Sequence, residues 1–251
     1  MRTNTRLAVS QPQSAIFGGP ALLSGIGILR DLTRDEIAAL ERRVSWVRHR
    51  AGEQVLSPQS ASRDAFLVVE GRVQVVGYSM NGREVAYASV EAGGMFGELS
   101  AIDGEPRSAT IVAQRDCLLA VLSPEVFLDL IARHPSVALA VIARLARIVR
   151  TCDDRIMDLS VLGAHQRVFV ELLRLARPDP VTPDKWLIFP LPTQSEIAGR
   201  ASTTRETVAR VVSQLNASGL VRRKGKTLYL SDRERLQRLA ERGPGRAAES
   251  C

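Results

Sequence analysis

Groups that could bind a sugar and a phosphate are concentrated in one short stretch, Phe96 to Ala109, which reads F-G-E-L-S-A-I-D-G-E-P-R-S-A. Gly97 lets backbone N–H groups approach an anion closely, because no Cβ stands in the way. The carboxylate of Glu98 suits a sugar hydroxyl better than a phosphate. Arg107 and Ser108 add a guanidinium and a hydroxyl that can share one phosphate. The stretch therefore predicts a pocket for a small, anionic sugar phosphate.

A second set of functional groups lies near the carboxyl end, where Thr193 to Arg210 reads T-Q-S-E-I-A-G-R-A-S-T-T-R-E-T-V-A-R. Two short apolar faces joined by a polar turn predict two crossed helices. Arg205 and Glu206 carry the groups that read a G·C pair, because arginine pairs with guanine and glutamate accepts from cytosine. Arg210, one turn further on, can reach another base or a phosphate. The basic run R-R-K-G-K at 222–226 predicts a β-wing that lies against phosphates.

Both patterns also have plain structural interpretations. A glycine-rich turn with an exposed Glu–Arg pair is common in β proteins. An R-E-x-x-x-R helix can be a solvated face with internal ion pairs. The elements around each pattern decide between the interpretations, since binding requires side chains that the fold brings together.

Short β-rich runs separated by glycine-containing turns extend from Trp46 to Val121, and they are typical of a β-barrel or jelly roll. Hairpin turns are expected at Glu70-Gly71 and at Asn81-Gly82. A helix capped by Thr33 precedes these runs, and Ser123-Pro124-Glu125 opens another helix after them. The sugar-phosphate stretch is thus expected inside a β-roll.

A long helix is predicted from Ser136, after His134-Pro135 interrupts the preceding helix, because over twenty residues follow without Gly or Pro. Alternating spacings of 4 and 3 along it give a heptad seam, typical of a helix that pairs with a second copy. The alternative is that this stripe packs only on its own roll. The seam consists of Val141, Leu145, Ile148, Cys152, Arg155 and Leu159. Gly163 is expected to end the helix and to act as a hinge.

The charge of the 251-residue chain is unevenly distributed. Residues 1–159 hold 18 Lys and Arg against 18 Asp and Glu, whereas residues 160–251 hold 16 against 9, which accounts for the whole net charge of +7. Only the second half is therefore expected to meet a polyanion. No apolar run approaches the ~18 residues of a membrane span, and the amino terminus has no apolar core of a secretory signal, so a cytoplasmic protein without a membrane partner is predicted. Cys117, Cys152 and Cys251 form no metal or disulfide pattern.

The two functional stretches resemble one known family. G-E-L-x₅-G-E-P-R-S-A is similar to the phosphate-binding cassette of cyclic-nucleotide-binding domains, especially in the family of the cyclic-AMP receptor protein and the fumarate-nitrate regulator. S/T-R-E-T-V-x-R followed by G-K-T resembles the winged DNA-binding domain of the same family. The resemblance covers roughly Leu32 to Asp232, and it implies an α+β fold: a cyclic-nucleotide-binding β-roll, a long dimerisation helix and a winged helix-turn-helix.

The resemblance assigns roles to individual residues. It places Glu98 on the ribose 2′-OH and Arg107 and Ser108 on the cyclic phosphate. The ligand-binding set is completed by Gly97, Leu99 and Ser100. On DNA it places Arg205, Glu206 and Arg210 at base edges or nearby phosphates, and it places Thr193, Thr204 and Lys226 on phosphates. One departure is Ser202, which stands where relatives have a turn glycine, so a strained residue with positive φ is expected there.

The expected domains follow from these assignments. They are a lead-in (1–30), the β-roll domain (31–135), the dimerisation helix (136–162), the winged helix-turn-helix domain (163–235) and a tail (236–251). No catalytic residue and no metal site is expected, and the protein is not expected to be an enzyme.

The base of the nucleotide is expected to be read from the long helix. The family's hydroxyl residues for adenine are replaced here by the run Thr151, Cys152, Asp153 and Asp154. A carboxylate suits the neighbouring N–H donors of guanine, so Asp153 or Asp154 is hypothesised to favour cyclic GMP over cyclic AMP. The alternative is that both acids are solvated or paired with Arg150 or Arg155.

The implied function is a switch in which cyclic nucleotide turns a homodimer into a sequence-specific DNA-binding form. The expected partners are a palindromic double-stranded DNA site and RNA polymerase, the latter through the loop at 177–184. Alternatives are a regulator of the same fold that responds to cyclic di-GMP, haem or redox, or one that binds DNA constitutively. An iron–sulfur cluster is not expected because the three cysteines are far apart in the sequence, and the histidines do not suggest a haem ligand.

Overall fold

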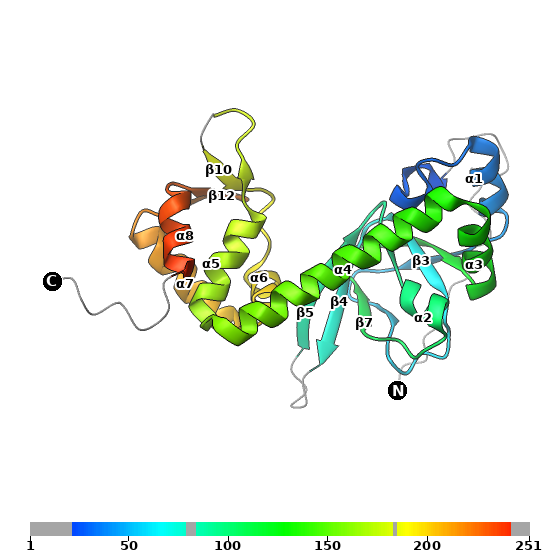
Figure 1. Cartoon of the computed structure of the whole chain (residues 1–251), viewed down its shortest axis with the longest axis horizontal. Coiled ribbons are helices and arrows are strands. Elements are labelled where there is room, and N and C mark those ends of the chain that lie inside the picture. Colours follow the sequence, from blue (N-terminus) through cyan, green and yellow to red (C-terminus); the bar gives the residue numbers. More distant parts are fainter. Residues whose placement is uncertain (1–21, 79–83, 183–184, 242–251) are drawn as a thin grey trace. The chain divides into compact units, whose positions relative to one another are not determined.

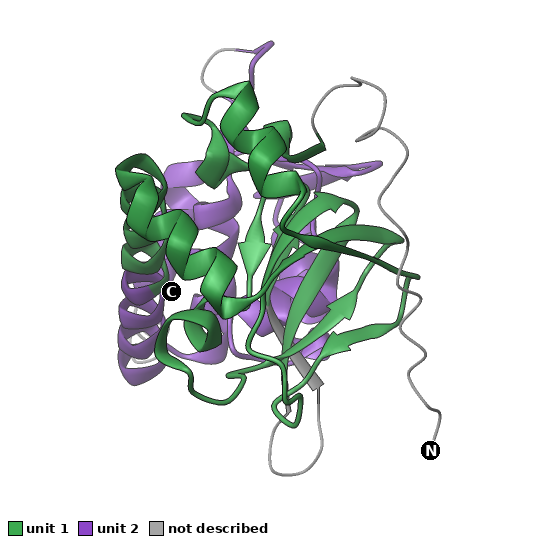
Figure 2. Ribbon diagram, turned by 90° about the vertical axis from the view of Figure 1, so that its right-hand side faces the viewer, with its two compact units in different colours: residues 1–148 green, residues 149–251 purple. Residues whose placement is uncertain are grey.

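The computed structural model describes residues 22–78, 84–182 and 185–241. The chain forms two compact units, residues 1–148 and 149–251, which Figure 2 shows in green and purple. The elements follow one another along the chain as labelled in Figure 1. The predicted hairpin turn Asn81-Gly82, residues 1–21 of the predicted lead-in (1–30) and residues 242–251 of the predicted tail (236–251) lie outside the described residues. In the described remainder of these two segments, Leu29 and Leu236 are fully buried.

The first unit contains the predicted β-roll, built from two antiparallel four-stranded sheets. One sheet has the order β1-β8-β3-β6 and the other β2-β7-β4-β5. The strands are β1 (Ser45–His49), β2 (Gln54–Leu56), β3 (Ala65–Glu70), β4 (Arg72–Tyr78), β5 (Glu84–Glu91), β6 (Met95–Phe96), β7 (Thr110–Ala113) and β8 (Cys117–Leu122). Buried apolar side chains of both sheets, including Val68, Val73 and Leu119, form the core between them.

Glu70-Gly71 does not form a hairpin, contrary to the sequence prediction. It links β3 to β4, which belong to different sheets. Gly71 has φ +88°, and a Cβ there would lie 2.3 Å from the carbonyl oxygen of Asp116. The glycine is needed for a close crossing between sheets, and a turn pattern in the sequence cannot distinguish this from a hairpin.

Helical elements cover one sheet of the roll and bury a second apolar cluster that includes Leu29, Trp46 and Phe127. They are η2 (Leu22–Gly25), η3 (Gly27–Leu29), α1 (Arg34–Glu41), α2 (Glu98–Asp103), α3 (Pro124–Arg133) and α4 (Pro135–Val161). The predicted caps are confirmed: the Thr33 hydroxyl accepts from the backbone N–H of Glu36 in α1, and the Ser123 hydroxyl accepts from Val126 in α3. The interruption at His134-Pro135 is also confirmed.

The long helix α4 presents a different apolar stripe from the one predicted. Val141 is only 3% exposed and packs, with Leu145, against the core of its own roll, so its placement in an inter-subunit seam is wrong. The neighbouring face carries large exposed apolar side chains, Ile142, Val149, Ile156 and Leu159. With Leu145 and Cys152 between them they again alternate by 3 and 4 residues. The apolar surface of α4 is wider than one seam, which is why the sequence spacing misplaced it.

No single helix in the described part of the chain is long and apolar enough to cross a bilayer. Among the described helices, only the pair α3 and α4 taken together reaches the required length and composition, and this pair is bent by 112°.

The second unit contains the predicted winged helix-turn-helix. Its elements are α5 (Ala164–Leu175), β9 (Arg177–Pro178), β10 (Trp186–Ile188), α6 (Gln194–Arg200), α7 (Arg205–Ala217), β11 (Val221–Lys224), β12 (Thr227–Leu230) and α8 (Arg233–Glu241). The sheet order is β11-β12-β10-β9, and the helices share a core that includes Val168, Ile197 and Val208.

Gly163 lies between α4 and α5, as the sequence predicted, but it does not end α4 in a left-handed conformation. It is the N-cap of α5 with φ −68°, a value open to any residue. Its backbone N–H donates to Oε1 of Gln166 at 2.9 Å. A glycine is therefore not required here by backbone geometry.

Candidate nucleotide and DNA sites

Gly97 brings the sugar-phosphate stretch into close contact with the roll. It follows β6 and caps α2 with φ +80°, a left-handed conformation that favours glycine. A Cβ at this position would lie 2.8 Å from the carbonyl oxygen of Asp64 and 2.9 Å from Nη1 of Arg107. The close approach lets α2 begin at Glu98.

Arg107 is almost completely buried, with 4% of its surface exposed. Its Nη1 donates to the carbonyl oxygen of Gly97 at 3.1 Å. Its Nη2 donates to Oγ of Ser62 at 3.2 Å and to the carbonyl oxygen of Asp64 at 2.8 Å. Its Nε has no hydrogen-bond partner among the described residues. Burial lowers the pKa of Arg107 from its ordinary value, and the nearby carboxylate of Asp64 acts in the opposite direction.

All the acceptors that hold Arg107 are neutral. Two are backbone carbonyls and one is a hydroxyl, and no described carboxylate hydrogen-bonds to this guanidinium. The Ser62 hydroxyl itself donates to Oδ2 of Asp64 at 2.5 Å. Burying a charge without a directly bound partner of opposite sign is costly, and the nearby Asp64 carboxylate does not hydrogen-bond to the guanidinium. The buried cation and its unpartnered Nε therefore form a site that an anion would complete.

Glu98 is buried beside the long helix rather than free in an open pocket, with 5% of its surface exposed. Nε of Arg144 on α4 donates to Oε1 of Glu98 at 3.2 Å, and Nη2 of Arg144 donates to the carbonyl oxygen of Met95 at 2.6 Å. Arg144 thus ties α4 to the start of α2. Sequence reasoning missed it, because nothing in the local pattern of a helix shows which arginine will meet a residue 46 positions away.

The remaining predicted residues of the stretch differ in accessibility. Ser108 is exposed and directly follows Arg107. Leu99 is 41% exposed, whereas Ser100 is 3% exposed within α2. The structure therefore brings together Gly97, Glu98 and Arg107 at the junction of β6 and α2, with Ser108 next to them in the chain.

Thr151, Cys152, Asp153 and Asp154 lie exposed on the part of α4 that belongs to the second unit. Oδ2 of Asp154 lies 3.9 Å from Nη2 of Arg174 on α5. That arginine also donates to Asp158 at 2.6 Å. Asp154 is thus paired, although with a different arginine from the two that the sequence suggested.

The helix-turn-helix presents its predicted DNA-reading groups outward. Arg205, Glu206 and Arg210 are exposed on α7, while Val208 and Val211 on the same helix are fully buried. Thr193 and Thr204 are the N-caps of α6 and α7. The Thr193 hydroxyl accepts from the Glu196 backbone N–H and donates to the Glu196 carboxylate, so both of its local hydrogen bonds serve the cap.

Ser202 has φ 47° and is the single non-glycine residue with positive φ in the described part of the chain. This confirms the strain expected from the missing turn glycine. The turn is held by Arg167 on α5, whose Nε donates to the carbonyl oxygen of Ala201 at 2.9 Å and whose Nη2 donates to that of Ser202 at 3.0 Å. Nη1 donates to the carbonyl oxygen of Leu162 at 2.7 Å. Arg167 therefore joins the end of α4 to the helix-turn-helix, a role that sequence reasoning missed.

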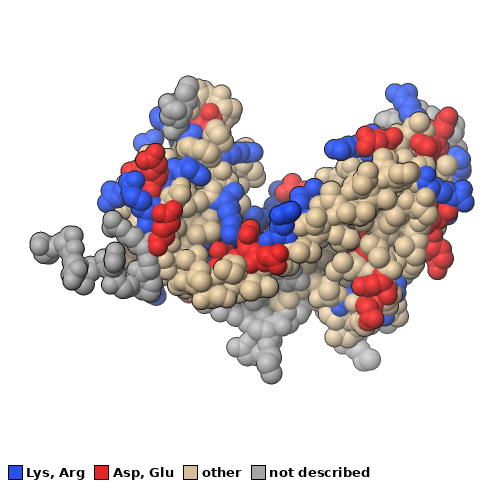
Figure 3. Space-filling view, viewed as in Figure 1, with Lys and Arg blue, Asp and Glu red and all other residues tan. Residues whose placement is uncertain are grey.

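The β11–β12 hairpin forms the predicted wing. Gly225, with φ +59°, makes its tip, and the basic residues Arg222, Arg223, Lys224 and Lys226 are exposed around it. Figure 3 shows Lys and Arg side chains at several places on the visible face of this unit. The unit can therefore attract a phosphate backbone. Among the described residues, no group of three or more His, Cys, Asp or Glu side chains could hold a metal ion.

Both units match known protein families. Residues 46–134 match the cyclic nucleotide-binding domain, and residues 166–239 match the Crp-like helix-turn-helix domain. The cyclic AMP receptor protein of Thermus thermophilus is 34% identical over 189 residues, covering 75% of this chain and 85% of that protein. A CRP-like cAMP-activated global transcriptional regulator of Mycobacterium tuberculosis is 27% identical over 227 residues, covering 87% and 98%. The crystal structure of the Thermus thermophilus catabolite activator protein shares 31% identity with a TM-score of 0.50, covering 86% and 98%.

A nucleotide-binding β-roll joined to a Crp-like helix-turn-helix defines a transcription regulator that binds a cyclic nucleotide. The chain belongs to the family of the cyclic-AMP receptor protein and the fumarate-nitrate regulator. The resemblance drawn from the two sequence motifs is thereby confirmed, together with the α+β fold.

Proposed function

We propose that a cyclic nucleotide binds at Arg107 and Glu98 and switches a homodimer of this chain to sequence-specific DNA binding. The observation that carries the proposal is the buried Arg107 guanidinium, which has neutral acceptors and an unpartnered Nε. The cyclic phosphate would supply the missing negative charge, with the Ser108 hydroxyl beside it. Glu98 would accept the ribose 2′-OH while Arg144 keeps its carboxylate in place. Backbone groups of Gly97, Leu99 and Ser100 would complete the site.

The base of the bound nucleotide is proposed to be one of two purines, adenine or guanine. Relatives named as cAMP-activated favour cyclic AMP. The exposed carboxylate of Asp153 favours cyclic GMP, because it could accept from two neighbouring guanine N–H groups. Asp154 is the weaker candidate of the two, since Arg174 already neutralises it.

The homodimer is proposed to form through the exposed apolar stripe of α4. Ile142, Val149 and Ile156 repeat every seven residues, and Cys152 and Leu159 continue the stripe at spacings of 3 and 4. Leu145 has the same spacing but packs partly against its own roll. Such a stripe costs free energy in water and packs well against its own copy. Two recognition helices of a dimer would then reach successive major grooves about 34 Å apart on a palindromic site.

On DNA, Arg205, Glu206 and Arg210 are proposed to contact base edges or nearby phosphates, with Thr193, Thr204 and Lys226 on phosphates. The first two residues of the predicted loop at 177–184 form strand β9 instead, and the rest of that loop is proposed to contact RNA polymerase. The experiment is isothermal titration of cyclic AMP and cyclic GMP into wild type, Arg107→Leu and Asp153→Asn. Arg115→Leu, which removes an exposed arginine of the same roll, is the matched control.

We expect Arg107→Leu to weaken binding roughly 10- to 100-fold, the loss of hydrogen bonds to a charged group. Arg115→Leu should bind as wild type does. Asp153→Asn should reduce a preference for cyclic GMP. Equal affinities of wild type and Arg107→Leu would overturn the proposed site, and an unchanged purine preference in Asp153→Asn would overturn the role of that residue.

A further inference from the structure

Two arginines connect the short helix α2 to the loop between β2 and β3. At the start of α2, Nη1 of Arg107 donates to the carbonyl oxygen of Gly97 at 3.1 Å, while its Nη2 donates to the loop at 3.2 and 2.8 Å. At the end of α2, Nε of Arg63 donates to the carbonyl oxygen of Gly104 at 3.0 Å. Arg63 is itself a residue of the loop. Both ends of α2 are therefore fixed to the same segment.

The guanidinium of Arg63 also holds the loop together from within. Its Nη1 donates to the carbonyl oxygens of Ser60, Ala61 and Ser62 at 3.2, 3.1 and 3.4 Å. A planar guanidinium fixes the directions of several acceptors at once, which the single ammonium of lysine does not. The hydroxyl of Ser62 is an acceptor for Arg107. Arg63 thus supports the piece of chain that directs the Arg107 guanidinium.

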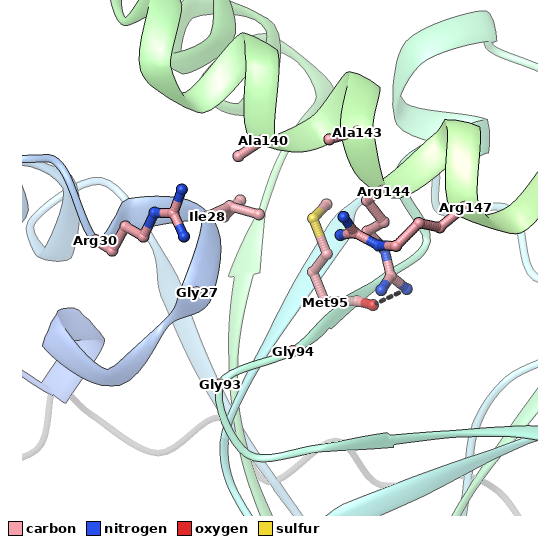
Figure 4. Close-up of a pocket in the computed structure, with 10 residues that line it drawn as sticks. All are labelled: Gly27, Ile28, Arg30, Gly93, Gly94, Met95, Ala140, Ala143, Arg144 and Arg147. Carbon is pink, nitrogen blue, oxygen red and sulfur yellow. Dashed lines mark hydrogen bonds between the residues drawn. The ribbon is translucent and has the colours of Figure 1, made fainter. Parts of the chain in front are cut away.

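The orientation of α2 depends on what holds its ends, because six residues form less than two turns and a helix this short is not stable alone. Its start is also held from α4. Figure 4 shows the hydrogen bond from Arg144 to the carbonyl oxygen of Met95, and Nε of Arg144 holds Glu98. At the other end of α2, the bond to Gly104 comes from Arg63, 41 positions away in the sequence. Loss of Arg63 would release the end of α2 while its start stays held.

The charge of Arg63 is offset by a neighbouring carboxylate. Burial lowers the pKa of Arg107, and next to this effect the Asp64 carboxylate raises the pKa while the Arg63 cation lowers it. The two charges therefore act on Arg107 in opposite directions. The contribution of Arg63 is expected to be geometric, so a different cation in its place should not preserve it.

We propose that Arg63 is a positioning residue of the nucleotide site, which sets the distance between the Arg107 guanidinium and the Glu98 carboxylate. This inference rests on the proposed function, because that function assigns the two groups to the phosphate and the ribose of one ligand. The phosphate of a cyclic nucleotide closes a ring on the sugar, so the ligand cannot adjust the distance between these two parts. Both protein groups must then be correctly placed at the same time.

The binding test is titration calorimetry of cyclic AMP and cyclic GMP into the full-length protein. Arg63→Met should weaken binding about fivefold, the effect of losing one orienting hydrogen bond. Arg63→Lys, which keeps the charge and loses the planar fork, should weaken binding nearly as much. Arg48→Met removes an exposed arginine of the same roll, which lies 3.9 Å from Glu70. It is the matched control and should bind as wild type does.

A double-mutant cycle shows whether Arg63 acts through Arg107. In the Arg107→Leu background, Arg63→Met should cause little further loss, because the guanidinium that it positions is absent. The same fivefold loss in both backgrounds would mean a general structural role and would overturn the proposal. Wild-type affinity in Arg63→Met or in Arg63→Lys would overturn it as well.

A measurement without ligand separates failure of this proposal from failure of the proposed function. In proton–nitrogen correlation spectra of the ligand-free protein, the Nε–H signal of Arg107 is identified by its absence from Arg107→Leu. Arg63→Met and Arg63→Lys should shift or broaden this signal, and Arg48→Met should leave it unchanged. An unchanged signal in both Arg63 variants overturns the positioning role whether or not a nucleotide binds. If the signal changes but wild type binds neither nucleotide, the proposed function fails and Arg63 still positions Arg107.

Discussion

At the scale of single residues, the buried Arg107 is both part of the fold and part of the proposed site. Its side chain reaches the Gly97 and Asp64 carbonyls and the Ser62 hydroxyl, and these contacts fix the direction of the guanidinium before any ligand arrives. A group held in position in advance loses less conformational entropy on binding. The loop that contains Ser62 and Asp64 is therefore part of the site, although no pattern in the sequence connects it with Arg107.

Ser62→Ala should weaken cyclic-nucleotide binding about fivefold, because one hydrogen bond of about 1 kcal/mol that orients Arg107 is lost. Ser60→Ala is the control: its hydroxyl accepts from the Ser57 backbone within the same loop and does not contact Arg107. Titration calorimetry on both variants measures the effect. Equal affinities would show that the loop does not position the guanidinium.

Glu171 in the second unit should make stability depend on pH. Burial raises the pKa of its carboxyl group, an effect larger than the opposing influence of Arg200, Arg174 and Arg155. Because the folded-state pKa is the higher one, the stabilising contribution is complete below the unfolded pKa and is lost as pH rises through the folded pKa. The melting temperature of wild type should therefore fall relative to that of Glu171→Gln as pH rises from about 4 towards neutral, given the ordinary Glu pKa near 4.3. A constant difference across that range would contradict the raised pKa.

At the scale of elements, the sequence predicted what local patterns determine. The caps at Thr33 and Ser123, the break at His134-Pro135 and the strained turn at Ser202 all follow from preferences of neighbouring residues. Arg144 and Arg167 could not be predicted, because each acts on segments far away in the sequence. The long arginine side chain meets carbonyls and carboxylates that only the folded chain brings near.

The predicted position of the α4 seam and the predicted hairpin at Glu70-Gly71 were wrong for a related reason. Helical spacing shows that α4 has apolar faces, but which face meets its own roll depends on tertiary packing. A Gly turn between two strand patterns likewise does not show whether the chain stays in one sheet.

Arg167→Met should weaken operator binding by roughly tenfold or more, because three hydrogen bonds from a charged donor to the turn and to the end of α4 are lost. Adding Ser202→Gly to the Arg167→Met variant should restore part of the lost affinity, since glycine relieves a left-handed strain of about 1 kcal/mol or more. Arg174→Met, on the same helix but bound to Asp158 instead of the turn, is the control. Fluorescence anisotropy on labelled DNA measures all four proteins, and wild-type affinity in Arg167→Met would show that the turn does not need this clamp.

At the scale of the whole molecule, each unit holds one half of the proposed function. The first carries the buried guanidinium and the second carries the exposed recognition helix and wing, while α4 runs from one into the other. The excess positive charge of residues 160–251 suits a unit that meets DNA.

Ile156→Asp should dissociate the proposed dimer, because it places a carboxylate within the exposed apolar stripe. Met157→Asp introduces the same charge at an equally exposed apolar position on a neighbouring face of α4, and it should leave the dimer intact. Sedimentation velocity distinguishes the two states. If Met157→Asp dissociated the dimer and Ile156→Asp did not, the dimer contact would lie on another face of α4.

The most direct test of the account is the affinity for an operator, selected from random oligonucleotides, measured with and without cyclic nucleotide in wild type and Arg107→Leu. We expect cyclic AMP or cyclic GMP to strengthen DNA binding by the wild type and to leave Arg107→Leu unchanged, while both proteins retain the same weak binding without ligand. An equal ligand response in the two proteins, or none in the wild type, would contradict the claim that a cyclic phosphate on this buried arginine controls the DNA-binding unit.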